Sequence, residues 1–218
     1  MAQTHFEEGE YYHVYNRGVE KRLIFLDDRD RWRFMTLLFV FQGDTIVSQM
    51  SRLVRFVEHQ MFDIEFFNNI LKGKRVELTC FCLMPNHFHL ILKETKEGGI
   101  SKFMQRLADA YAKYFNSRYD RTGHLFGGRF QSVHVNRNAY LNYLSAYVHL
   151  NPKELLKWKR REIDYPWSSF QDFVFENRWG DFLSTEILLG QFKDGKEYKS
   201  FVEETPIKEK LDDKHFLD

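Results

Sequence analysis

Two histidines near the middle of the chain have the spacing of a metal site. Phe88, Leu90 and Leu92 alternate with His87 and His89, which is the period of a β-strand. Side chains two residues apart on a strand point to the same face, so both imidazoles would project together while the apolar residues face the core. Two imidazoles so placed can bind one divalent ion. Taken alone, the spacing also fits two polar residues on a solvent-facing strand.

A second group of polar side chains lies at the end of a predicted helix. Tyr147 and Asn151 are four residues apart, so they lie one turn apart on the same helical face. Pro152 should end this helix. His149 points elsewhere on the helix, and we expect it to be structural or to face DNA.

The segment 118–129 is predicted to be a basic loop that contains several glycines. Arg side chains and backbone N–H groups suit phosphate oxygens, and aromatic rings can stack on unpaired bases. An ordinary solvated surface loop is the alternative. The net charge is only +1, so any nucleic-acid binding has to come from local clusters. The candidate DNA contacts are Arg118, Arg121, His124, Arg129, Phe130 and, further along the chain, Lys159, Arg160 and Arg161.

These side chains need a mixed scaffold of strands and helices. Aromatic and β-branched residues predict strands at 11–16, 76–83, 87–92 and 131–135, with a tight Pro85-Asn86 turn between the middle two. Apolar periodicity predicts helices at 28–41, 48–71, 101–118 and 139–150. The expected N-caps are Asp27, Ser101, and Asn136 or Asn138. This order predicts an α+β, ferredoxin-like βαββαβ antiparallel sheet with an added C-terminal helix that carries Tyr147.

Length and composition predict a soluble globular protein, with one well-buried domain and appendages or at most two small domains. The chain has 218 residues, of which 43% are hydrophobic and 29% charged. No apolar run is long enough to span a bilayer, and the N-terminus lacks the order of a signal peptide, so we expect a cytoplasmic protein with no membrane partner. Cys80 and Cys82 are two apart in one predicted strand, where a disulfide is difficult to close.

Several motifs together resemble the HUH single-strand endonucleases, in the form used by insertion-sequence tyrosine transposases and their REP-associated relatives. The resemblance covers about residues 8–172. Its motifs are Arg17-Gly18, Met84-Pro85-Asn86-His87-Phe88-His89-Leu90-Ile91, Gly123-His124-Leu125-Phe126, Gly128-Arg129-Phe130, Tyr147-Val148-His149-Leu150-Asn151-Pro152 and Pro166-Trp167-Ser168-Ser169-Phe170.

The resemblance implies a nuclease and strand transferase that acts on single-stranded DNA at the foot of a hairpin. It implies that His87, His89 and Asn151 bind Mg²⁺ or Mn²⁺, and that Tyr147 is the nucleophile. It adds Arg17 to the expected DNA contacts. Insertion-sequence members usually carry Gln at the third ligand position, whereas Asn151 fits the REP-associated branch. The partners it implies are single-stranded or hairpin DNA, and the protein would act as a monomer or a homodimer.

The residue chemistry agrees with this mechanism. Tyr147 would attack phosphorus to give a 5′-phosphotyrosine and release a 3′-hydroxyl, which conserves the bond energy for rejoining. Tyrosine titrates near pH 10, so attack at neutral pH would benefit from a nearby cation. Tyr111 and Tyr114 are rival nucleophiles, although they also fit the apolar periodicity of a core helix.

Two other functions remain open from the sequence. One is a catalytically silent, domesticated protein that binds hairpin DNA, and the other is an unrelated hydrolase with a histidine-bound metal and a small substrate. We predict a transposase-like HUH nuclease domain over residues 1–172, with a helical insert at about 43–74, followed by a helical and polar extension at 173–218.

Overall fold

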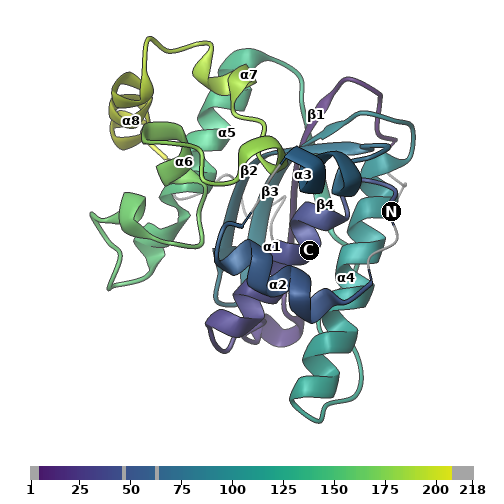
Figure 1. Ribbon diagram of the computed structural model, residues 1–218. Coiled ribbons are helices and arrows are strands. Elements are labelled where there is room, and N and C mark those ends of the chain that lie inside the picture. The colour runs from purple at the N-terminus through teal and green to yellow at the C-terminus, as the bar shows by residue number, and fades with distance from the viewer. Residues whose placement is uncertain (1–4, 46–47, 62–63, 208–218) are drawn as a thin grey trace.

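A four-stranded antiparallel sheet lies at the centre of the molecule (Figure 1). The computed structural model describes residues 5–45, 48–61 and 64–207. The strands lie side by side in the order β2-β3-β1-β4. Their bounds are β1 Tyr11–Arg17, β2 Val76–Met84, β3 His87–Glu94 and β4 Gln131–Val135. This order, with helices in the connections, confirms the predicted α+β ferredoxin-like fold.

The helices of the described residues follow the predicted order, with one region divided differently. They are α1 (Asp28–Val40), α2 (Met50–Glu58), α3 (Ile64–Ile70), α4 (Gly99–Arg118), α5 (Asn138–Leu150), α6 (Phe170–Val174), α7 (Glu186–Leu189) and α8 (Gly195–Glu204). Short 3-10 turns are η1 (Val19–Lys21), η2 (Asn151–Glu154), η3 (Glu162–Asp164) and η4 (Gly180–Phe182). The single helix expected at 48–71 is two helices, α2 and α3; residues 62 and 63 lie outside the described part. None of the described helices is both long and apolar enough to cross a membrane.

Helices cover both faces of the sheet. α1 and α4 pack on the face that carries Phe88, and the ring of Phe34 lies 5.0 Å from it, centroid to centroid. α5 packs on the other face, where the ring of Tyr147 lies 5.4 Å from that of His89. Alternate side chains of β3 are therefore buried on opposite faces, with Phe88 only 1% and His89 only 3% exposed.

The β2–β3 hairpin is closed by the predicted two-residue turn. Met84 pairs with His87 across it, which leaves Pro85 and Asn86 as the loop. The carbonyl of Pro85 accepts hydrogen bonds from the backbone N–H groups of Ile24 and Phe25. The segment between β1 and α1 therefore holds in place the turn that directly precedes His87.

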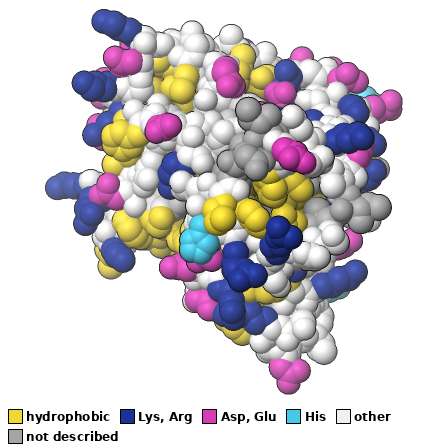
Figure 2. All heavy atoms as spheres, viewed as in Figure 1, with side chains coloured by type: hydrophobic (Ala, Val, Ile, Leu, Met, Phe, Trp, Pro, Cys, Tyr) yellow, Lys and Arg dark blue, Asp and Glu magenta, His cyan; other side chains and the backbone are white. Residues whose placement is uncertain are grey.

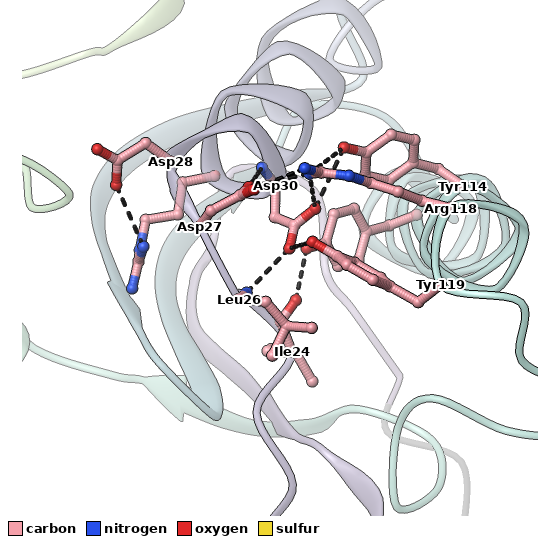
Figure 3. Close-up of polar contacts among 10 residues, drawn as sticks. Ile24, Leu26, Asp27, Asp28, Asp30, Tyr114, Arg118 and Tyr119 are labelled. Atoms are coloured by element: carbon pink, nitrogen blue, oxygen red, sulfur yellow. Dashed lines mark hydrogen bonds and ion pairs between the residues drawn. The ribbon is translucent and has the colours of Figure 1, made fainter.

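An ion-pair network joins the start of α1 to the end of α4 (Figure 3). Asp27 is the N-cap of α1, as predicted, and accepts a hydrogen bond from the backbone N–H of Asp30. The fully buried carboxylate of Asp30 accepts hydrogen bonds from Arg118, Tyr114 and Tyr119. Three side chains from the end of α4 thus meet at one buried acid of α1.

The expected N-cap of α4 was wrong. The helix begins at Gly99, two residues before Ser101, with Gly98 at the cap position in a left-handed conformation (φ 70°). The carboxylate of Glu94 accepts hydrogen bonds from the backbone N–H groups of Gly99 and Ile100. A carboxylate at the end of β3 thus satisfies the donors for which a serine side chain was expected.

The expected caps of α5 were also wrong. Arg137 occupies the N-cap position, and no side-chain hydrogen bond caps this helix. Asn138 is instead the first residue of the helix, and Asn136 precedes the cap position. Without a side-chain cap, α5 is stabilised by its packing against the sheet and against α8.

The C-terminal segment packs directly on the helix that carries Tyr147. His149 on α5 is fully buried, and its ring nitrogens lie 2.8 Å from Ser169 Oγ and 2.8 Å from the hydroxyl of Tyr198 on α8. This assigns His149 a structural role, one of the two that were expected. The segment after residue 172 therefore helps to position α5, while the proposed domain division at that residue stays a prediction.

Burial of His149 predicts a pH dependence of stability. Burial lowers the pKa of His149 to about 3 from its ordinary value of 6.5. Between these values the unfolded chain binds a proton that the folded chain does not, so this contribution is present above pH 6.5 and is lost as the pH falls. We expect His149→Gln to reduce the slope of the unfolding free energy by about 1.4 kcal/mol per pH unit in this window.

Urea unfolding at pH 7, 6 and 5 measures this slope. The matched control is His124→Gln, since His124 is exposed. Parallel slopes for wild type and His149→Gln would show that His149 does not carry the effect.

Candidate active site

A cleft of about 570 Å³ opens where β1 and β3 end beside α5. Both predicted histidines and Tyr147 lie on its wall, so the fold brings together side chains from distant parts of the chain. The lining residues are Tyr15, Asn16, Arg17, Gly18, Glu20, Lys21, His87, Phe88, His89, Gly127, Gly128, Arg129, Gln131, Tyr147 and Glu154.

The contacts of His87 determine which of its ring nitrogens carries the proton. Asn86 Nδ2 donates to the carbonyl of Lys21 at 3.2 Å, so Asn86 Oδ1 is the atom that faces His87 Nδ1, at 2.7 Å. An amide oxygen only accepts, so His87 Nδ1–H is the donor and Nε2 carries the lone pair. The lone pair of Nε2 then faces Asn151 Oδ1 at 3.0 Å.

A cation beside these two acceptor atoms would satisfy both, as would a rotation of the Asn151 amide that lets Nδ2 donate to Nε2. A proton on Nε2 is one such cation, but burial lowers the pKa of His87 to about 4. The hydrogen bond with Asn151 raises this pKa, and the positive charge of Arg17 lowers it by a smaller amount. The pKa of His89 also lies well below its ordinary value because the ring is buried. Both imidazoles are therefore neutral at neutral pH, the state in which histidine binds metals.

The donor set that converges here consists of two imidazoles and one amide oxygen. Among the described residues, no group of three or more His, Cys, Asp or Glu side chains is placed to hold a metal. His87 Nε2 lies 3.0 Å from Asn151 Oδ1, and the rings of His87 and His89 lie 5.1 Å apart, so the three predicted ligands are neighbours. Imidazole and amide oxygen ligands suit Mn²⁺ and related divalent ions.

Tyr147 lies against the histidines with its hydroxyl group in an unfavourable setting for ionisation. Its ring meets that of His89 edge to face, with centroids 5.4 Å apart. Burial raises the pKa of Tyr147 to about 12; Glu154 also raises it, whereas a hydrogen bond with Asn151 lowers it. The phenol is therefore protonated at neutral pH, and a positive charge close to it would favour its reaction.

The predicted DNA contacts Arg17 and Arg129 both line this cleft, together with Lys21. Gly127 holds the two sides together, because its backbone N–H donates to the carbonyl of Arg17 at 2.9 Å. Three basic side chains around the histidines are suited to a phosphate backbone that passes through the cleft.

Other predicted contacts lie elsewhere. The guanidinium of Arg118 is paired with Asp27 at 2.5 Å and with Asp30 at 2.6 Å, which gives it a structural role (Figure 3). Arg121 donates to Asn116 Oδ1 at 3.0 Å. Neither of these arginines is among the residues that line the cleft, because the end of α4 turns them toward α1 and their own helix.

The remaining predicted contacts are not among the residues that line the cleft. Phe130 is stacked on Phe6, with ring centroids 6.2 Å apart, and His124 is exposed. The basic run after η2 is exposed, and one of its members pairs locally with Asp164 at 3.0 Å. The run consists of Lys159, Arg160 and Arg161.

The rival tyrosines belong to the core. Tyr111 is fully buried, and its hydroxyl donates to the carbonyl of Ile24 at 2.5 Å. The hydroxyl of Tyr114 donates to the carboxylate of Asp30 at 3.2 Å. Both lie on α4, on the face of the sheet opposite to the histidines. Tyr147 lies on α5, on the same face as the histidines, and its ring contacts that of His89.

A wider cleft of about 800 Å³ lies on that opposite face, between α1, α2 and α4. Arg29, Arg33 and Arg55 line it, and Figure 2 shows Lys and Arg side chains gathered over α2. The histidines and Tyr147 do not contribute to it. We therefore place the chemistry in the smaller cleft beside α5, because that cleft holds the reactive groups.

His13, which contacts His89, was not identified by the sequence analysis, and neither were the lining residues Lys21 and Glu154. His13 lies on β1, is 1% exposed, and its Nε2 lies 3.0 Å from Nδ1 of His89. The available signal was its spacing: His13 and Tyr15 are two residues apart on one strand, so they point to the same face of the sheet. That face also carries the histidines of the neighbouring strand.

The fold and the site together define a class of protein. Its features are a ferredoxin-like sheet, a strand with a His-x-His motif and a neighbouring helix that carries a tyrosine. Residues 49–151 match the family described as "Transposase IS200 like". The matched segment includes His87, His89 and Tyr147 and ends at Asn151. No curated protein sequence matches the chain significantly.

A solved structure of similar fold is a REP-associated tyrosine transposase bound to a REP hairpin. The TM-score is 0.54 at 14% sequence identity, and the match covers 86% of this chain and 95% of that chain. At this identity the likeness establishes a shared fold. The family match and the shared fold confirm the resemblance that the motifs indicated.

Proposed function

We propose that this protein is a metal-dependent tyrosine transposase or single-strand endonuclease that cleaves DNA beside a hairpin. The observation that carries the proposal is the convergence of Tyr147, His87, His89 and Asn151 at one cleft with basic walls. A nucleophile, neutral ligand atoms and phosphate-binding side chains are the three components that phosphodiester transfer needs.

In the proposed reaction the oxygen of Tyr147 attacks phosphorus and the bond from phosphorus to the 3′ oxygen breaks. The products are a 5′-phosphotyrosine and a 3′-hydroxyl, and the proton lost by the phenol balances the one gained by the leaving oxygen. Arg17, Lys21 and Arg129 would hold the phosphates on either side of the bond. Bound Mg²⁺ or Mn²⁺, held by His87, His89 and Asn151, would supply stabilisation of the negative charge.

Hairpin DNA is the proposed partner because the solved relative of similar fold is bound to a REP hairpin. The open, basic cleft also favours a polymer over the small substrate of an unrelated hydrolase, whose site would be closed. We propose action as a monomer or a homodimer, in the cytoplasm.

The direct test is covalent capture of DNA. The protein is incubated with labelled single-stranded hairpins from sequences that flank its own gene, with Mn²⁺, Mg²⁺ or a chelator, and is then run on a denaturing gel. We expect a protein–DNA band that depends on the metal and is absent in His87→Ala. Hairpin binding without an adduct in any metal would favour a silent DNA-binding protein, and hydrolysis of small esters without DNA binding would favour the hydrolase.

The salt dependence of binding separates the cleft arginines from surface charges. We expect Arg17→Gln combined with Arg129→Gln to reduce the slope of log K against log salt by about 0.7 for each phosphate that the two arginines neutralise. The matched control is Lys113→Gln, an exposed residue of α4. The same measurement with Lys159, Arg160 and Arg161 replaced by Gln tests that run, and an unchanged slope removes either assignment.

A further inference from the structure

His13 and His89 form a buried pair across two neighbouring strands. Nε2 of His13 lies 3.0 Å from Nδ1 of His89, and the ring planes differ by 20° with centroids 5.1 Å apart. Nearly parallel rings at this separation, with two nitrogens in contact, describe a hydrogen bond that runs edge to edge. In the strand register Tyr15 pairs with His89, so His13 approaches its partner diagonally from further along β1.

Only one proton can lie in this hydrogen bond. Whether it is bonded to His13 Nε2 or to His89 Nδ1 determines whether Nε2 of His89 can bind a metal ion. If His13 Nε2–H donates, His89 Nδ1 accepts, and the proton of the neutral His89 ring must sit on Nε2. If His89 Nδ1–H donates, Nε2 of His89 carries the lone pair. The second arrangement alone leaves an unprotonated Nε2 as a metal ligand on His89, whose ring lies 5.1 Å from that of His87 and 5.4 Å from that of Tyr147.

In His87, the other predicted ligand, Nδ1 is likewise the protonated nitrogen and Nε2 the unprotonated one. His87 Nδ1–H donates to Asn86 Oδ1, whose orientation is fixed by the hydrogen bond from Asn86 Nδ2 to the carbonyl of Lys21. Nε2 of His87 consequently carries its lone pair toward Asn151. Nδ1 of each site histidine therefore contacts a side chain that is neutral at neutral pH, Asn86 for His87 and His13 for His89.

We propose that His13 is a positioning residue that accepts a hydrogen bond from His89 Nδ1–H and so presents Nε2 of His89 as a metal ligand. The inference rests on the proposed function, because it assigns His89 to a metal site. His13 acts through His89 and does not itself touch the substrate.

The surroundings explain why a histidine serves at this position. His13 is 1% exposed, and its ring lies 5.1 Å from that of Tyr15 and 6.0 Å from that of Tyr147. A carboxylate in this aromatic enclosure would be costly to bury, whereas a neutral imidazole provides an acceptor and fills the space. The partner is therefore an acceptor that adds no charge beside the nucleophile.

The tautomer of His89 can be measured on the metal-free protein without DNA. We expect long-range ¹H–¹⁵N NMR spectra of histidine-labelled protein at pH 7 to show His89 with a protonated Nδ1 and an unprotonated Nε2, assigned by the disappearance of its signals in His89→Gln. A protonated Nε2 on His89 would overturn the proposal. Because neither metal nor nuclease activity enters this measurement, its result is independent of whether the proposed function holds.

Metal affinity provides the second readout. In His13→Phe, which keeps a ring but removes the acceptor, we expect Mn²⁺ to bind about 10- to 100-fold more weakly in a calorimetric titration. In His13→Gln, whose side-chain oxygen can accept the same proton, we expect most of that affinity to return. Equal Mn²⁺ affinity of wild type and a folded His13→Phe, judged by its thermal unfolding, would overturn the proposal. If wild type bound no Mn²⁺, the metal part of the proposed function would fail, and His13 would then have no ligand to position.

Discussion

Tyr147→Phe is expected to abolish the covalent protein–DNA adduct and to lower the cleavage rate by more than about 10³-fold, because the variant lacks the oxygen that would form the phosphotyrosine. The ring of Phe would still fill the space beside His89, since the two rings meet edge to face at 5.4 Å. Hairpin affinity should therefore change by less than about 2-fold, because only the phenol oxygen is removed. Adduct formation on denaturing gels and hairpin binding by fluorescence anisotropy measure the two quantities.

Tyr143→Phe is the matched control for this experiment. Tyr143 lies one turn before Tyr147 on α5 but is not among the residues that line the cleft. Its replacement should leave both adduct formation and binding as in wild type. An adduct that persists in Tyr147→Phe would remove this tyrosine as the nucleophile and direct attention to Tyr15, which also lines the cleft.

Asp30→Asn is expected to destabilise the protein by about 3–5 kcal/mol, because an amide cannot accept from all the donors around this buried carboxylate, although Arg118 keeps its ion pair with Asp27. Asp30 is fully buried, and its two oxygens accept from Arg118 at 2.6 Å, from Tyr119 at 2.8 Å and from the backbone N–H of Leu26 at 2.9 Å (Figure 3). An amide in the same place would turn an N–H₂ group toward some of these donors. The free energy of unfolding from urea titrations measures the loss.

Asp28→Asn is the control for the buried network. Asp28 is on the same turn of α1, but its side chain is 74% exposed and lies 3.4 Å from Arg31. Removal of this exposed pair should cost no more than about 1 kcal/mol. Equal losses for the two variants would show that the Asp30 network contributes no more than a surface ion pair.

The network also shows that Arg118, a predicted DNA contact, has ion-pair partners within the fold, while its contact with DNA stays a prediction. A basic residue at the end of a helix, next to a glycine-bearing loop, resembles a phosphate ligand in sequence. Arg118 is instead drawn to Asp27 and Asp30, which lie 91 and 88 positions earlier in the chain. Sequence spacing gives no information about such a distant partner, so Arg118 and Arg129 were indistinguishable before the fold was known.

The sequence alone determined the framework of the site. The alternation around His87 and His89 predicted one strand face for both, and the four-residue spacing predicted one helical face for Tyr147 and Asn151. Strand and helix periods depend only on local backbone geometry, so these relations hold whatever the rest of the chain does. The order of the elements was sufficient to predict the ferredoxin-like sheet.

Tertiary structure decided what covers the histidine face. The alternation showed that Phe88 and His89 point in opposite directions, but it could not show that α5 buries the second face as well. That burial is what lowers the pKa of both site histidines and raises that of Tyr147 to about 12. The antiparallel pairing of β1 with β3 brings His13 against His89, 76 residues later in the chain. Desolvation and hydrogen bonding across strands depend on which surfaces meet, and no local pattern of residues encodes that meeting.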